Sequence, residues 1–170
     1  MIPAFSVVGK SNSGKTTLIE KLVTELKRRG YRVGTVKHDV HGFEVDHEGK
    51  DTWRHRQAGA DVVVIASPDK MAMIESLSGE LPLGDILARV RGVDLIVTEG
   101  FKRGPLPKLE VLRSARSREL LCAEDPQLFA IASDVPLNGT AAAAAPVFEW
   151  NDATGLVDLI ERRFLGAGAP

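Results

Sequence analysis

Eight consecutive residues, from Gly9 to Thr16, carry two glycines, a lysine and a threonine at the spacing G-x-x-x-x-G-K-T. The largely apolar run from Phe5 to Val8 precedes them and predicts a short buried strand. After them, apolar residues recur at helical spacing on one face: Leu18, Ile19, Leu22, Val23 and Leu26. A strand, a glycine-rich loop and an amphipathic helix in this order constrain the chain to an α/β fold with a phosphate-binding loop.

The residue types in this loop match the chemistry of a nucleoside triphosphate. Gly9 and Gly14 let consecutive backbone N–H groups close around phosphate oxygens, because glycine tolerates positive φ angles and close approach. The N-terminus of the following helix adds a partial positive charge. We expect Lys15 to reach the β- and γ-phosphates and the Thr16 hydroxyl to bind Mg²⁺. The alternative is an ordinary glycine-rich turn with an exposed lysine.

Length and composition predict the class of protein. A chain of 170 residues with 44% apolar composition fits one α/β domain over residues 1–165, followed by a flexible tail at 166–170. A formal net charge of -1 argues against nucleic acid as the main partner. The single cysteine, Cys122, cannot form an internal disulfide, and no apolar stretch approaches the roughly 20 residues of a membrane helix. These features predict a cytoplasmic protein that does not interact with membranes.

Further apolar runs alternate with helical patterns along the chain. This alternation predicts an α/β fold like that of P-loop nucleotide-binding proteins, a mainly parallel sheet with helices on both faces. Residues 71–75 could add an antiparallel strand. Strands are expected near 32–37, 61–66, 94–98, 108–112 and 128–132, and helices near 49–58, 83–90 and 153–164.

Two acidic residues flank the buried run 95–98, and their positions along the strand separate their roles. In a parallel sheet the ligand lies at the carboxyl ends of the strands, which is the edge that holds Glu99. Asp94 begins the same run, about 16 Å away at roughly 3.3 Å per residue. We therefore expect Glu99 to bind Mg²⁺ through water or to orient an attacking water, and Asp94 to be structural. A strand-end carboxylate that caps backbone N–H groups is the alternative for Glu99.

The second expected strand ends in a polar cluster that contains Lys37, His38, Asp39 and His41, and His47 and His55 follow it. The spacing of the four histidines does not match a standard zinc site, and no cysteine lies nearby. A polar active-site loop is the favoured interpretation, because His38 and Asp39 leave the carboxyl end of a strand adjoining the phosphate loop.

A third strand end, at Ser133 and Asp134, offers a place for base recognition. A carboxylate there can accept hydrogen bonds from both N1–H and the amino group of guanine, a pair of donors that adenine lacks. The Asn-Lys-x-Asp signature of switch GTPases is absent from the chain. A turn-forming aspartate before Pro136 is therefore the alternative for Asp134.

Taken together, these motifs resemble the molybdopterin-guanine dinucleotide biosynthesis protein B (MobB) family over nearly the whole chain. The phosphate loop alone is common to many families, so the later motifs carry the resemblance. In order they are Thr35-Val36-Lys37-His38 with His41 and Asp46, Gly49-Lys50-Asp51-Thr52, Ala58-Gly59-Ala60, Glu99-Gly100-Phe101-Lys102 and the segment from Ala132 to Asn138.

The resemblance implies a GTP-binding protein with weak GTPase activity that forms a homodimer. It also implies a role in molybdenum cofactor biosynthesis, in which the protein assists the guanylyltransferase that converts molybdopterin to molybdopterin guanine dinucleotide, with the pterin as a further candidate ligand. Glu99 and Asp39 would serve Mg²⁺ or the attacking water beside Lys15, and the Lys37-His38 and Lys50-Asp51 segments would line the site. The phosphates would be held by Gly9, Lys10, Ser11, Asn12, Ser13, Gly14, Lys15, Thr16 and Thr17.

Two other functions remain open from the residues themselves. Arg113, Arg116 and Arg118 follow the strand expected at 108–112 and could form the mobile lid of a small-molecule kinase. Alternatively, the protein could be a nucleotide-sensing adapter without significant turnover, in which GTP favours one conformation for a partner enzyme.

Overall fold

The computed structural model describes residues 1–117, 119–137 and 145–166. The chain divides into two compact units, of which the first joins Met1–His38 to the residues from Leu87 onward and the second is Asp39–Ile86. The single domain expected over residues 1–165 stays a prediction. The alanine-rich residues 141–144 and residues 167–170 of the expected tail lie outside the described part.

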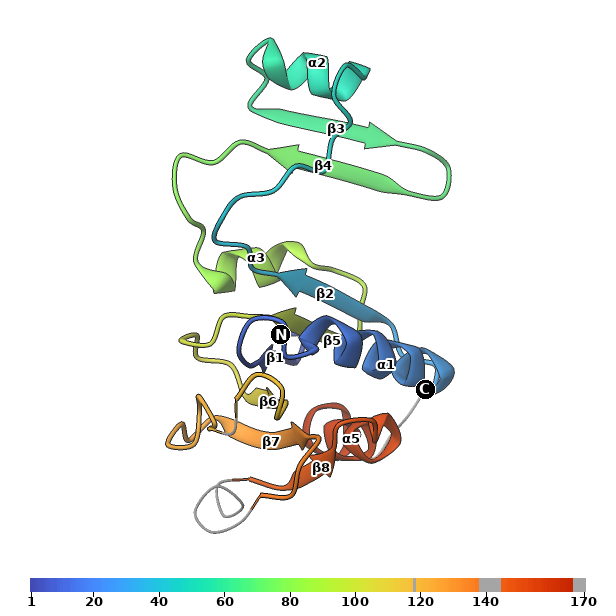
Figure 1. Ribbon diagram of the computed structural model, residues 1–170. Helices are drawn as coiled ribbons and strands as arrows, with labels where there is room; N and C mark the ends of the chain where they lie inside the picture. The colour runs from blue at the N-terminus through green and yellow to red at the C-terminus, as the bar shows by residue number, and fades with distance from the viewer. Residues whose placement is uncertain (118, 138–144, 167–170) are drawn as a thin grey trace. The chain divides into compact units, whose positions relative to one another are not determined.

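The first unit is built on one parallel sheet (Figure 1), which has six strands among the described residues. The order across the sheet is β2-β5-β1-β6-β7-β8, and every neighbouring pair is parallel. All carboxyl ends therefore meet at one edge. The strands are β1 (Ala4–Val8), β2 (Val33–Lys37), β5 (Leu95–Glu99), β6 (Lys108–Leu112), β7 (Leu128–Ser133) and β8 (Val147–Glu149).

Two helices pack together against one face of this sheet. They are α1 (Lys15–Arg28) and α5 (Ala153–Ile160), which lie side by side (Figure 1). Helix α5 is followed directly by the π-helical turn η1 (Glu161–Leu165). Helix α1 contacts β1, β2 and β5, and the apolar stripe expected along it is buried. The core on this face includes Phe5, Val7, Leu18, Leu22, Leu26, Leu95, Val97, Leu109, Val111, Leu156 and Ile160.

The opposite face of the sheet holds polar side chains that bind the segment after β6. Glu110, only 1% exposed, accepts hydrogen bonds from the backbone N–H groups of Leu121 and Cys122, at 2.6 and 2.9 Å. Burial raises the pKa of Glu110, and the two N–H donors oppose that shift. Lys108, equally buried, pairs with Asp125 at 2.9 Å. The interactions satisfy buried charges and hold residues 121–125 on the sheet.

The second unit contains a two-stranded antiparallel sheet, formed by β3 (Val62–Ala66) and β4 (Met71–Glu75), together with α2 (Asp51–Gln57). Helix α2 contacts β3. Helix α3 (Leu83–Arg89) crosses from this unit into the first. On one face of the hairpin, Val64 and Met73 lie opposite each other and are 51% and 52% exposed.

The fold class predicted from the sequence is confirmed as a mainly parallel sheet with helices and an antiparallel addition at Met71–Glu75. One strand differs in its placement, because β3 pairs with β4 instead of joining the large sheet. Strand β8 was not predicted, since three residues are too few to show a periodic pattern. None of the helices in the described residues is long and apolar enough to span a membrane.

Candidate nucleotide-binding site

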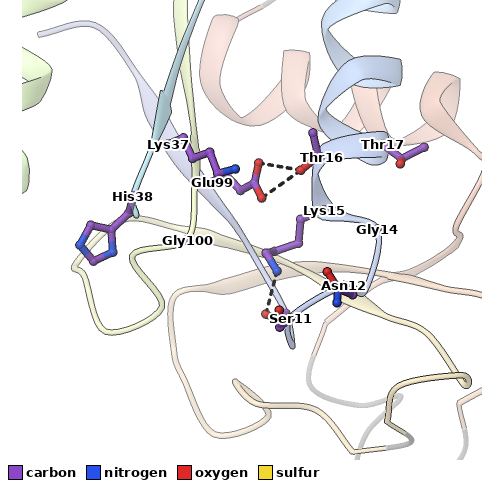
Figure 2. Close-up of a pocket in the computed structure, with 11 residues that line it drawn as sticks. Ser11, Asn12, Gly14, Lys15, Thr16, Thr17, Lys37, His38, Glu99 and Gly100 are labelled. Atoms are coloured by element: carbon purple, nitrogen blue, oxygen red, sulfur yellow. Dashed lines mark hydrogen bonds between the residues drawn. The ribbon is translucent and has the colours of Figure 1, made fainter. Parts of the chain in front are cut away.

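A cavity of about 590 Å³ lies at the carboxyl edge of the parallel sheet (Figure 2). Its volume is in the range that is typical of small-molecule sites. The loop between β1 and α1 forms one side, and the ends of β2 and β5 form the other. The lining residues are Gly9, Ser11, Asn12, Gly14, Lys15, Thr16, Thr17, Lys37, His38, Glu99 and Gly100.

The backbone of the loop takes positive φ angles where the sequence supplies residues that tolerate them. Gly9 has φ of 145° and Gly14 has φ of 88°, while Asn12, at 57°, is one of the few non-glycine residues that enter this region readily. A Cβ atom on Gly9 would lie 2.5 Å from the carbonyl oxygen of Val111. The tight path predicted for the loop therefore depends on glycine both for conformation and for space.

Lys15 reaches back over the loop from the first residue of α1. Its Nζ donates hydrogen bonds to the carbonyl oxygens of Lys10 and Gly9, at 2.9 and 3.2 Å. Burial lowers the pKa of Lys15, the charge of Glu99 raises it, and that of Lys37 lowers it further. The ammonium group is thus held where an anion enclosed by the loop would meet it.

Thr16 faces Glu99 across the cavity. The Thr16 hydroxyl is 3.1 and 3.0 Å from the two carboxylate oxygens of Glu99, to which it donates (Figure 2). Glu99 reaches this place because it ends β5 in register with Val7 of β1. Two hard oxygen groups beside a phosphate loop suit Mg²⁺, which commonly combines one or two protein oxygens with substrate phosphates. No group of three or more His, Cys, Asp or Glu side chains that could hold a metal ion occurs among the described residues.

Lys37 and His38 end β2 beside Glu99. Lys37 is the register partner of Glu99, and the backbone N–H of His38 donates to the Glu99 carbonyl oxygen at 3.1 Å. The imidazole ring of His38 stacks on Phe101, with ring centroids 4.5 Å apart. Figure 2 shows this ring pointing away from Lys15. The structure therefore brings both residues to the cavity.

Three other predicted residues are not among those that line the cavity. Lys10 is exposed, and Ser13 is buried with no hydrogen-bond partner for its hydroxyl within the described part of the chain. Asp39 begins the second unit and accepts a hydrogen bond from the His41 backbone at 2.8 Å. Its predicted role at Mg²⁺ stays a prediction.

The family motif at Lys50 and Asp51 lies in a second cavity, which belongs wholly to the second unit. Asp46, His47, β3 and β4 supply much of its remaining wall. In the same unit, the Thr52 hydroxyl donates to Asp46 at 2.6 Å, just inside the start of α2. A contribution of the Lys50-Asp51 segment to the nucleotide site stays a prediction.

Asp134 follows β7 and binds the segment after β6. Its carboxylate accepts from the Ser114 N–H at 2.8 Å and from Arg113 Nε at 2.9 Å. The Ser114 N–H is the main cause of a lowered Asp134 pKa, with a smaller contribution from Arg113. Of the arginines considered for a kinase lid, Arg113 is held here, Arg116 donates to the Asn12 carbonyl oxygen at 3.4 Å, and residue 118 lies outside the described part.

Sequence reasoning missed Trp150, which stands directly after β8 and packs against the phosphate loop. A Cβ atom on Gly14 would lie 3.1 Å from the Trp150 ring. The Arg113 guanidinium lies 4.0 Å and Lys21 Nζ 3.9 Å from the centre of that ring. An aromatic residue at the carboxyl end of a strand would have indicated a place beside the loop, but β8 itself was not recognised in the sequence.

The model of the family described as molybdopterin guanine dinucleotide synthesis protein B, MobB, matches residues 4–134. The chain belongs to the MobB family. The match includes the phosphate loop, Glu99 and Asp134, so the resemblance stated from the motifs is confirmed. It also places both units of the structure within one family pattern.

Curated proteins and solved structures agree with this assignment. The chain is 39% identical to a molybdopterin-guanine dinucleotide biosynthesis adapter protein of Haemophilus influenzae, over 80% of this chain and 77% of the relative. It is 37% identical to the adapter protein of Escherichia coli, over 94% and 92%. A crystal structure of molybdopterin-guanine biosynthesis protein B is similar with a TM-score of 0.73 and 31% identity, over 95% and 99%, and that of Bacillus subtilis MobB with 0.72 and 28%, over 96% and 98%.

Proposed function

We propose that this MobB family member binds GTP with Mg²⁺ and acts as an adapter with weak GTPase activity. Its partner would be the guanylyltransferase that converts molybdopterin to molybdopterin guanine dinucleotide, the product that the relatives' names give. The observation that carries the proposal is the Lys15 ammonium held over the loop, with the Thr16–Glu99 pair beside it.

The phosphates would take over interactions that the loop now makes with itself. Lys15 would exchange the carbonyl oxygens of Lys10 and Gly9 for β- and γ-phosphate oxygens, and the loop N–H groups would hold the rest of the chain of phosphates. Thr16 would bind Mg²⁺, and Glu99 would hold it directly or through water. When bound, Mg²⁺ would offset the negative charge of the phosphates.

Weak turnover agrees with what surrounds the cavity. Among the described residues, Glu99 is the only carboxylate that lines the cavity, and it already accepts the Thr16 hydroxyl. A carboxylate occupied at the metal is poorly placed to orient an attacking water as well. We propose Asp39 as a further ligand of Mg²⁺, directly or through water. The cytoplasmic location remains a prediction from the sequence.

The first experiment is calorimetric titration with GTP, ATP and a non-hydrolysable GTP analogue, each with and without Mg²⁺. We expect GTP to bind in preference to ATP, and Lys15→Ala to weaken binding by about 10- to 100-fold, because a charge-assisted hydrogen bond is lost. The matched control is Lys27→Ala, which removes an exposed lysine from the last turn of the same helix. A preference for ATP, or binding that is indifferent to Lys15→Ala, would contradict the proposal.

We also propose that a second copy of the chain covers the exposed hairpin face to form a homodimer. A two-stranded sheet is marginally stable alone, and Val62, Val64, Met71 and Met73 are 48–69% exposed on this hairpin. The matching apolar face of an identical hairpin is a self-complementary partner. Light scattering at micromolar concentration should show a dimer, Val64→Asp should yield a monomer, and Lys70→Ala should not. A monomeric wild type would exclude the dimer.

A further inference from the structure

Three residues form a compact cluster at the carboxyl edge of the sheet, beside the phosphate loop. Arg113 follows β6, Asp134 follows β7 and Trp150 follows β8, so each leaves the end of a neighbouring strand. Because the strands are parallel, these ends share the edge that holds the phosphate loop. The indole of Trp150 reaches the loop itself, at the backbone of Gly14.

The Arg113 side chain connects the other two members of this cluster. Its guanidinium lies 4.0 Å from the centre of the Trp150 ring, within the range of a cation–π contact. Its Nε donates to Asp134 Oδ2 at 2.9 Å, while the other carboxylate oxygen accepts the Ser114 N–H at 2.8 Å. One planar group is therefore held on an aromatic surface and bonded to a carboxylate.

Guanine offers the same two features. Its ring is flat and stacks on aromatic side chains, and its N1–H and amino groups present adjacent donors, as a guanidinium does. A carboxylate that accepts from a guanidinium can accept from this edge of guanine. The edge of adenine lacks one of the donors and places an acceptor at the corresponding nitrogen.

The contacts of Arg113 can be exchanged. The side chains of Arg113 and Asp134 are 30% and 25% exposed, so an incoming group can reach the pair from solvent. A partly exposed ion pair adds little net stability, because both charges regain water when they separate. Two donors from Ser114 would keep the carboxylate in place after Arg113 leaves: its N–H donates to Oδ1 at 2.8 Å and its hydroxyl to Oδ2 at 3.2 Å.

We propose that the Arg113 guanidinium occupies the position of the nucleobase in the nucleotide-free protein, and that guanine displaces it. The base then lies on Trp150 and donates to Asp134, while the phosphates are held by the loop. This inference rests on the proposed binding of GTP at the loop. It identifies Trp150 as the base platform, and it makes Arg113 a competitor of the nucleotide.

The test separates base from phosphate by titrating with GDP and with inorganic tripolyphosphate, each with Mg²⁺. Arg113→Ala and the longer Arg113→Gln should both bind GDP more tightly than the wild type. We expect about three- to tenfold, since the competent fraction of the wild type is reduced by the occupying side chain. Tripolyphosphate affinity should stay unchanged. Arg91→Ala, which removes an exposed arginine before the amino end of β5, is the matched control for lost charge.

A second readout follows Trp150 directly. In a Trp53→Phe background Trp150 is the remaining tryptophan, and GDP should quench its fluorescence far more strongly than tripolyphosphate does, because only GDP carries a base. Both Arg113 variants are checked by circular dichroism so that a folding defect is recognised.

The outcomes distinguish this inference from the function on which it rests. If both arginine variants bind GDP more weakly, or if GDP and tripolyphosphate affinities change in parallel, Arg113 binds the nucleotide or has a structural role. The inference is then overturned. GDP binding that depends on Lys15 but leaves Trp150 fluorescence unchanged also overturns it, and the proposed function stands. If neither GDP nor tripolyphosphate binds in a Lys15-dependent way, the proposed function fails together with the inference.

Discussion

The hydroxyl of Thr16 donates to both carboxylate oxygens of Glu99, at 3.1 and 3.0 Å, although 83 residues separate them in the chain. Thr16 is held by the start of α1 and Glu99 by the end of β5. Both are therefore placed by regular elements that are anchored in the buried core. Such rigid placement is what a site for a divalent cation requires, because the ligand geometry of Mg²⁺ tolerates little variation.

Removing either member of this pair should impair the Mg²⁺ dependence of GTP binding. We expect Thr16→Val and Glu99→Gln each to reduce the stimulation by Mg²⁺ at least about tenfold, as is usual when groups that hold or orient a metal are lost. Titrations with and without Mg²⁺ measure the effect. Thr24→Val is the control, because the Thr24 hydroxyl donates to the Glu20 carbonyl oxygen on the same helix. Unchanged Mg²⁺ stimulation in both variants would remove the pair from the metal site.

Replacement of Gly9 by alanine should damage the phosphate loop. The φ of 145° and the contact of a new Cβ with the Val111 carbonyl oxygen at 2.5 Å lead us to expect a loss of about 1–3 kcal/mol in the free energy of unfolding. GTP binding should be lost as well. Gly84→Ala is the matched control: Gly84 lies in α3 with open space around it and should gain about 0.5–1 kcal/mol. Urea unfolding measures the free energy of unfolding of both variants. If Gly9→Ala were as stable as the wild type, the requirement for glycine at position 9 would be contradicted.

Cys122 should react slowly with thiol reagents in the native protein. Its side chain is buried, and burial, followed by the charge of Glu110, raises its pKa to about 11. At pH 8 the thiolate is then about one part in a thousand, and the thiolate is the reactive form. A colorimetric thiol assay with and without urea measures this protection. Rapid modification of the folded protein would show that residues near 122 open readily from the sheet.

Acid should weaken the ion pairs that Glu25 makes with Arg28 and Arg29 on α1. Arg29 pairs with Glu25 at 2.8 Å, with Asp158 at 2.7 Å and with Glu161. Hydrogen bonds from Arg28 and then Arg29 lower the pKa of Glu25 from 4.5 to about 2. Because the folded pKa is depressed, this stabilisation is complete above about pH 4.5 and is lost as the pH falls toward 2.

Thermal unfolding across this pH range tests the contribution of Glu25. The contribution of Glu25 should disappear from the pH profile of Glu25→Gln, which keeps the shape of the side chain without its charge. Parallel profiles for the wild type and Glu25→Gln would show that Glu25 does not contribute.

Much of the fold could be predicted because its signals are local. The β6 strand was predicted at its observed bounds, and most of the others within one or two residues, since buried strands of a parallel sheet appear as short apolar runs. The antiparallel strand at Met71–Glu75 was also recognised. Which strands pair with each other was harder to predict from the sequence. The apolar residues of β3 suit either sheet equally well, and the hairpin with β4 places them in the second unit.

Some residues of the site could likewise be predicted from the sequence, and others could not. Lys15 and Thr16 follow from a motif of adjacent residues, and Glu99 from its place at a strand end, and the structure brings all three to one cavity. The contacts of Arg113, Asp134 and Trp150 connect the ends of three strands. Spacing along the chain carries no information on such contacts, because each residue's partner is set by the strand order.

The sequence by itself determined the phosphate loop, the helix that follows it and the strand that ends at Glu99, because backbone conformation and burial are encoded in neighbouring residues. Only the tertiary structure decided that Glu99 meets Thr16, that β3 leaves the main sheet and that Arg113 lies on Trp150 beside the loop. The physical reason is strand order. It places residues far apart in the chain at one edge, where their charges and ring faces become partners.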